Sequence, residues 1–156
     1  MDTTTAELWM REALEEARKA ESQGEVPVGA VVLVNDKIVG RGHNQTVGLH
    51  DPSAHAEVLG LRHAARFMKN YRLPGSVLVV TVEPCVMCVG AIIQARIELV
   101  VYGAADPKAG CLDSHLRLAN AVHLNHHFDV MSGILAQECG DLIRAFFVSR
   151  RGLWSP

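Results

Sequence analysis

The segment from Val77 to Cys88 reads VLVVTVEPCVMC and contains two structural signals in succession. Its first half is a nearly unbroken run of apolar, mostly β-branched residues, which is typical of a central strand covered on both faces. Pro84 favours the first turn of a helix, so we expect a helix over 85–95. A strand at 99–102 would then lie parallel to the first, because strand–helix–strand crossovers join parallel strands.

Apolar spacing predicts the other elements around this unit. We expect helices at 4–23, 54–69 and 133–149, and an antiparallel hairpin of strands 28–34 and 38–40. Asp51 or Ser53 could cap the first amides of the second helix. The resulting order, α-β-β-α-β-α-β followed by a mixed tail, predicts an α/β fold: a three-layer α/β/α sandwich on a mixed sheet. No repeat or linker interrupts it, so residues 1–156 are expected to form a single domain.

Composition and charge exclude several classes of protein. The 156 residues are 49% hydrophobic and 21% charged, which fits a globular chain and not a disordered one. No apolar run reaches the roughly 18 residues of a membrane span, and the start, MDTTTAE, does not have the pattern of a secretory signal. We therefore expect a cytoplasmic protein without a membrane partner.

A formal net charge of −2 does not by itself indicate a nucleic-acid partner. The best local cluster of positive charge is Arg144, Arg150 and Arg151. The simpler interpretation of this cluster, which the sequence pattern favours, is the solvated end of a helix.

Three residues in two motifs have the types and number of a catalytic metal site. Cys85 and Cys88 would share one face of a helix near its N-terminus, where the amide dipoles favour thiolates. Alone, such a pair fits a redox couple or two buried thiols equally well. His55 and Glu57 are two residues apart, so both can address one site only at the entrance of a helix. One imidazole and two thiolates would hold zinc and leave its fourth position free, as catalytic sites do.

The combined pattern, H-x-E followed by P-C-x-x-C, is a known signature of zinc-dependent nucleobase deaminases. In such a site Glu57 would take a proton from the attacking water, pass it to a ring nitrogen and help protonate departing ammonia. The residues therefore predict hydrolytic deamination, with His55, Cys85 and Cys88 as ligands of one Zn²⁺ per subunit and no organic cofactor.

Beyond these motifs, the chain resembles the bacterial tRNA-specific adenosine deaminases of the cytidine deaminase-like superfamily. The zinc motifs are shared across that superfamily, whereas the flanking stretches and the C-terminal segment are similar to the tRNA enzymes. The similar positions are 25–31, 44, 51–57, 70–73, 81–91, 96–97, 102–104, 106–108, 133–135, 138–139, 146–147 and 150–151.

The resemblance implies a central sheet of five strands, a homodimer, and conversion of the wobble adenosine (position 34) of an arginine tRNA to inosine. The target base would leave the anticodon loop and enter the zinc site. By the same resemblance, the substrate would be contacted by the purine-binding Asn44, by Val28 in the base pocket, by Asp106 at the neighbouring ribose, and by Phe147, Arg150 and Arg151 near the RNA backbone.

Simpler interpretations of these residues remain open. Asn44 could merely hold its loop, and Asp106 could merely form a turn. Ala105 occupies a position where relatives can carry a basic residue, so one phosphate contact is expected to be missing. Cys111 carries no clear signal, and Cys139 is expected to be a small core residue.

Two other functions also remain open. One is deamination of a free base or nucleoside, of the guanine or cytosine/cytidine type. The other is a non-catalytic zinc-bearing subunit that binds RNA, which the presence of Glu57 disfavours. No second metal-ligand spacing emerges from the remaining histidines, which are His43, His50, His63, His115, His123, His126 and His127.

Overall fold

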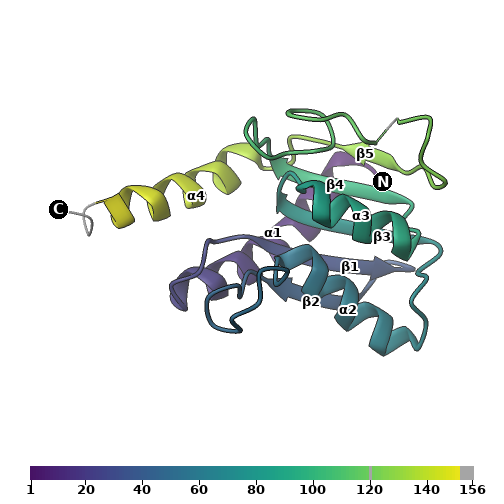
Figure 1. Ribbon diagram of the computed structural model, residues 1–156, viewed down its shortest axis with the longest axis horizontal. Helices are drawn as coiled ribbons and strands as arrows, with labels where there is room; N and C mark the ends of the chain where they lie inside the picture. Colours follow the sequence, from purple (N-terminus) through teal and green to yellow (C-terminus); the bar gives the residue numbers. More distant parts are fainter. Residues whose placement is uncertain (120, 152–156) are drawn as a thin grey trace.

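The computed structural model describes residues 1–119 and 121–151 (Figure 1). Within them the elements follow the order α1 (Thr3–Ser22), β1 (Gly29–Val34), β2 (Lys37–His43), α2 (Ala56–Met68), β3 (Ser76–Val82), α3 (Val86–Ala95), β4 (Leu99–Ala104), β5 (Asp129–Met131) and α4 (Ala136–Arg151). None of the helices in this described part is long and apolar enough to cross a membrane.

The strands form one mixed sheet in the order β2-β1-β3-β4-β5. The β1–β2 hairpin closes at Asn35 and Asp36, whose positive φ angles of 49° and 56° are those of a type I′ turn. β1 pairs antiparallel with β3, whereas β3–β4 and β4–β5 are parallel. The expected five-stranded mixed sheet is therefore confirmed, and β5 supplies the strand that apolar spacing did not locate.

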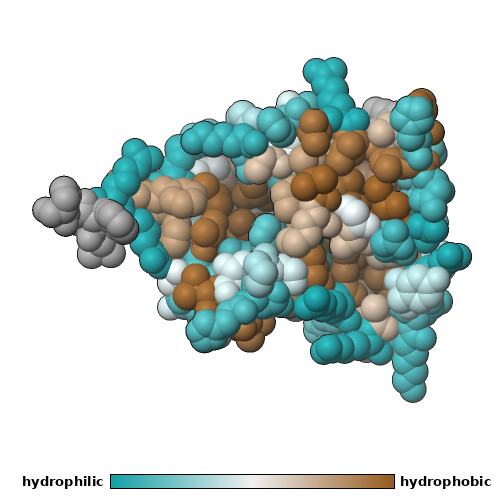
Figure 2. All heavy atoms as spheres, viewed as in Figure 1, coloured by the Kyte–Doolittle hydropathy of each residue, from teal (hydrophilic) through white to brown (hydrophobic). Residues whose placement is uncertain are grey.

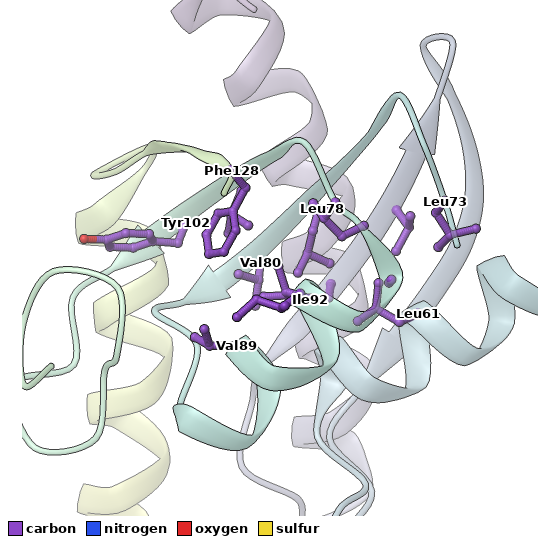
Figure 3. Packing of buried hydrophobic residues seen from close by; sticks show 14 of the residues in the cluster. Leu61, Leu73, Leu78, Val80, Val89, Ile92, Tyr102 and Phe128 are labelled. Carbon is purple, nitrogen blue, oxygen red and sulfur yellow. The ribbon is translucent and has the colours of Figure 1, made fainter. Parts of the chain in front are cut away.

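Alternate residues of the central strands face two separate cores. Val80 belongs to the core under α2 and α3, whereas Val79 belongs to the core under α1 and the first turn of α4. Figure 3 shows Leu61 of α2 and Ile92 of α3 packed toward Leu78 and Val80. Each such fully buried side chain contributes about 1.5–3 kcal/mol to folding. Helices cover both faces of the sheet, which confirms the three-layer α/β/α sandwich.

The boundaries of α2 differ from the prediction in a way that matters for the site. The helix begins at Ala56, with His55 as its N-cap in an extended conformation. The Asp51 carboxylate accepts hydrogen bonds from the Ser53 amide and hydroxyl, both through Oδ1. The predicted capping of the helix amides by Asp51 or Ser53 is therefore wrong, since these residues shape the turn that precedes the helix.

The buried face of α1 includes Ala6 and Met10, whereas Leu8 is 54% exposed. The predicted start of the last helix needs correction. α4 begins at Ala136 and not at position 133, because Gly133 and Leu135 both have positive φ angles that interrupt a helix. Beyond its first turns, α4 extends past the ends of the strands and away from the rest of the molecule (Figure 1).

Candidate active site

Three potential metal ligands meet where α2 and α3 begin. His55 is the N-cap of α2, Cys85 is the N-cap of α3, and Cys88 lies in the first turn of α3. The distance from His55 Nδ1 to each sulfur is 3.6 Å, and the three ligand atoms lie within 4.8 Å of one another. A tetrahedral zinc with ordinary Zn–N and Zn–S bonds places nitrogen and sulfur about 3.6 Å apart. The donor set therefore fits zinc in both chemistry and spacing.

The electrostatics of the two thiols are coupled. Hydrogen bonds from Cys88 and His55 hold the pKa of the Cys85 thiol below its usual value, although burial opposes them. The pKa of Cys88 is raised, because its thiol donates to Cys85 and because it is buried. The hydrogen bond to Cys85 also raises the pKa of His55. These contacts and the two nearby helix N-termini favour the thiolate form of Cys85, and a metal cation would displace the proton of Cys88.

Glu57 lies beside this triad in the first turn of α2 and is only 4% exposed. The expectation that His55 and Glu57 share the entrance of a helix agrees with the structure, because the extended His55 precedes the helical turn that carries Glu57. Burial raises the pKa of Glu57 to about 7. A carboxyl group with such a pKa can both accept and donate a proton at neutral pH.

The close approach of α2 to β2 fixes the position of this helix entrance. A Cβ atom on Gly42 would lie 2.2 Å from the Ala56 carbonyl oxygen and 2.5 Å from the Gly60 amide nitrogen. Only glycine therefore allows the first turns of α2 to rest directly on the backbone of β2. This contact holds the residue before the helix, His55, next to the sheet.

A groove of about 880 Å³ runs between α4 and the ends of β1, β3 and β4. In Figure 2 apolar side chains lie in the hollow between α4 and the rest of the molecule. Five of the six residues expected to contact substrate line this groove, namely Val28, Asp106, Phe147, Arg150 and Arg151. The structure thus brings together residues that are far apart in the sequence.

The sixth, Asn44, is buried at the end of β2 and does not line the groove. Its backbone amide donates to the Val28 carbonyl oxygen at 3.1 Å, which places it beside a groove residue. Asp106 forms a turn, as the simpler interpretation held, because its Oδ1 accepts from the amides of Lys108 and Ala109. It nevertheless also borders the groove.

Arg150 has a contact that the sequence did not predict. Its guanidinium donates to the Gly24 carbonyl oxygen and lies over the Phe146 ring, 4.7 Å from the centroid. Arg150 therefore attaches the end of α4 to the turn after α1, although it is exposed, as are Phe147 and Arg151.

Two buried glutamates near the site also lacked a sequence signal. The Glu25 carboxylate accepts from the amides of Val47 and Gly48 in the loop that follows Asn44. The Glu83 carboxylate accepts hydrogen bonds from several backbone amides of the loop after β4. Neither residue belongs to a motif with ligand spacing, and their partners are mainly backbone amides, which carry no side-chain signature.

In the described part of the chain, the other histidines and cysteines do not build a second metal site. His43 contacts Glu16 and Gln23, and His63 accepts from the Arg41 amide. Within residues 1–119 and 121–151, the only cluster of three or more potential ligands is His55, Cys85 and Cys88. Cys139 is buried, as expected for a core residue, and Cys111 is buried as well.

A family model described as the cytidine and deoxycytidylate deaminase zinc-binding region matches residues 3–104. This chain therefore belongs to the zinc-binding cytidine and deoxycytidylate deaminase family. Its metal triad and buried glutamate lie within the matched region.

Closer relatives narrow the assignment to one branch of that family. The tRNA-specific adenosine deaminase of Bacillus subtilis is 46% identical over 92% of this chain and 89% of its own length. The enzyme of the same name from Haemophilus influenzae is 48% identical over 93% and 84%. A solved structure from a study of A-to-I editing by tRNA:A34 deaminases superposes with a TM-score of 0.83 at 42% identity, covering 86% of this chain and 97% of the other. The chain groups with the tRNA-specific adenosine deaminases.

Proposed function

We propose that this protein converts adenosine to inosine at the wobble position, 34, of a tRNA by zinc-dependent hydrolysis. The observation that supports the chemistry most directly is the pair of 3.6 Å distances from His55 Nδ1 to the two cysteine sulfurs, next to a buried carboxyl group. The proposed substrate rests on the similarity to the tRNA-specific adenosine deaminases named above. The proposed tRNA is an arginine tRNA, and the proposed location is the cytoplasm.

In this reaction His55, Cys85 and Cys88 would hold one Zn²⁺ per subunit, which would make a water molecule nucleophilic at neutral pH. Glu57 would accept a proton from that water as its oxygen bonds to C6 of the adenine, and would deliver the proton to the ring nitrogen. Glu57 would next take the second proton from the new C6 hydroxyl group. It would pass that proton to the amino group as the C6–N bond breaks and ammonia leaves. The pKa of about 7 suits both transfers.

The groove would receive the anticodon loop. A base of a single-stranded loop can be turned out at little cost, because it has no pairing partner to lose. Val28 would line the pocket of the flipped purine, and Asn44 would donate to or accept from the base edge. Asp106 would contact the neighbouring ribose. The exposed Phe147 and the cationic Arg150 and Arg151 would lie along the RNA backbone, where they add attraction that salt weakens.

We also propose a homodimer that uses the outward face of α3. Val86 and Met87 on this face are 59% and 36% exposed, and Figure 2 shows apolar side chains gathered over α3. A second copy would remove this surface from water. Light scattering on the purified protein should give twice the mass of the 17.0 kDa chain, whereas a monomeric mass would contradict the dimer.

A substrate panel tests the proposed activity. The purified zinc-loaded protein should form inosine in an anticodon stem-loop that carries adenosine at position 34, and should not act on free adenosine, cytidine or guanine. A stem-loop with guanosine at position 34 is the matched control and should remain unchanged. If free guanine or cytidine releases ammonia while the stem-loop stays intact, the protein is a deaminase of free bases or nucleosides instead. Inertness toward the whole panel would favour the non-catalytic RNA-binding alternative.

A further inference from the structure

Glu83 lies between the end of β3 and the N-cap of α3, and the residue is 3% exposed. Oε2 accepts a hydrogen bond from the Asp106 amide at 3.1 Å and another from the Ser114 hydroxyl. Oε1 accepts from three consecutive amides, at 3.1, 2.7 and 2.9 Å, which belong to Leu112, Asp113 and Ser114. One carboxylate thus joins the two ends of the loop 106–114.

Two further contacts draw this loop against the same short segment. The Cys111 amide donates to the carbonyl oxygen of Pro84 at 2.8 Å. A Cβ atom on Gly110 would lie 2.3 Å from Glu83 Oε2 and 2.6 Å from the Asp106 carbonyl oxygen, so only glycine permits the loop to close this tightly. The loop is therefore built around the carboxylate and does not merely touch it.

The hydrogen bonds between the Glu83 carboxylate and the loop 106–114 form a clamp. This clamp joins two parts of the molecule that the proposed reaction needs together. The loop carries Asp106 and Lys108, which line the groove. The segment that carries Glu83 continues directly into Cys85 and Cys88. Hydrogen bonds from several donors to one buried carboxylate are strong and directional. They therefore set the position of the loop 106–114, which forms the rim of the groove, relative to the metal ligands.

We propose that Glu83 is a positioning residue that holds the RNA-facing rim of the groove in place relative to the metal ligands. This inference rests on the proposed action on RNA. In the described part of the chain, Glu83 belongs neither to the ligand cluster nor to the lining of the groove. Its loss should therefore weaken RNA binding and leave the chemical step of bound substrate almost unchanged.

The test is Glu83→Gln in the full-length, zinc-loaded protein, with the anticodon stem-loop as substrate. Glutamine keeps the shape but offers one acceptor oxygen, and its NH₂ group would face the amides that now donate. We expect the KM to rise roughly tenfold or more, since hydrogen bonds to a charged group are worth at least that factor. The kcat should stay within about threefold and the zinc content should not change. Hydrogen exchange should become faster at the amides of 106 and 112–114.

Glu98→Gln is the matched control. Glu98 also accepts from a loop amide, that of Gly75 at 2.8 Å, but it is exposed and lies at the opposite end of β4. Its replacement should leave the KM unchanged. Gly110→Ala is a second route to the same displacement, because the added methyl group pushes against the intact carboxylate, and it should also raise the KM. If Glu83→Gln does not fold, the KM of Gly110→Ala tests the proposal in its place.

Two results would overturn the inference. In the first, Glu83→Gln or Gly110→Ala lowers only the melting temperature while KM stays at the wild-type value, so that the clamp serves stability alone. In the second, the kcat and the zinc content fall together, so that Glu83 supports the metal ligands and not the groove rim. A wild-type protein that acts on a free base and not on RNA would instead refute the proposed function, and the hydrogen-exchange result would still report on the clamp itself.

Discussion

Replacing Glu57 with alanine should leave the fold and the zinc content intact and lower turnover by several orders of magnitude. The loss of a general acid–base group alone typically costs at least ~100-fold. Here the same carboxyl group is proposed to act in every proton transfer of the reaction. The ligand cluster in the described part of the chain, His55, Cys85 and Cys88, contains no carboxylate that could take over this role. Single-turnover measurement of inosine formation, together with zinc analysis of the same sample, checks this result.

Glu57→Gln is the sharper companion variant, because it keeps the volume of the side chain and removes only its capacity to carry a proton. Its turnover should fall as far as that of the alanine variant. The stability of both variants should equal or exceed that of the wild type, since an ionisable group that is 4% exposed is costly to bury. Turnover at the wild-type level in either variant would end the proposed mechanism.

The second large effect is expected from Cys88→Ala. Cys88 is fully buried in the first turn of α3 and contributes one of the two sulfurs of the metal triad. Its removal should abolish stoichiometric zinc binding and lower turnover at least about 1000-fold, because without the metal no water becomes nucleophilic at neutral pH. The melting temperature should fall as well, since metal binding contributes to folding free energy. Elemental analysis, calorimetry and the stem-loop assay measure these three quantities.

Cys139→Ala is the matched control for this variant. Cys139 is also a buried cysteine, but it lies on the inward face of α4 and packs into the core close to Gly103. Its replacement should retain full zinc content and turnover, with a modest loss of stability from the small cavity. A Cys88→Ala protein with full zinc content, or a Cys139→Ala protein without zinc, would contradict the assignment of the ligands.

Much of the fold could be predicted from the sequence because its central elements have strong local patterns. The apolar run at 77–82 became β3, and the turn at 35–37 lies where the hairpin closes. β5 has only three residues, none of them fully buried. It forms a strand because the edge of β4 offers backbone hydrogen-bonding partners. The pairing with β4 depends on the tertiary structure and not on the residues of β5.

The candidate site also contains residues that the sequence could predict and residues that it could not. His55, Cys85 and Cys88 could be predicted because side-chain type and spacing define a metal site. Arg150 could not be placed from the sequence, since its acceptor is a backbone carbonyl oxygen 126 residues away. Glu83 escaped notice for a related reason, because its partners are mainly amides of a distant loop. Contacts between a side chain and a remote backbone leave no periodicity in a sequence.

The most direct test of hydrolytic deamination at position 34 is mass spectrometry of the anticodon stem-loop after incubation with the zinc-loaded protein in ¹⁸O-labelled water. Hydrolysis forms a new C6–O bond with oxygen from solvent, so each product strand should contain inosine at position 34 that carries one ¹⁸O atom. The Glu57→Ala protein should yield no labelled strand. RNA that remains adenosine at position 34, or inosine formed there without the label, would contradict the account.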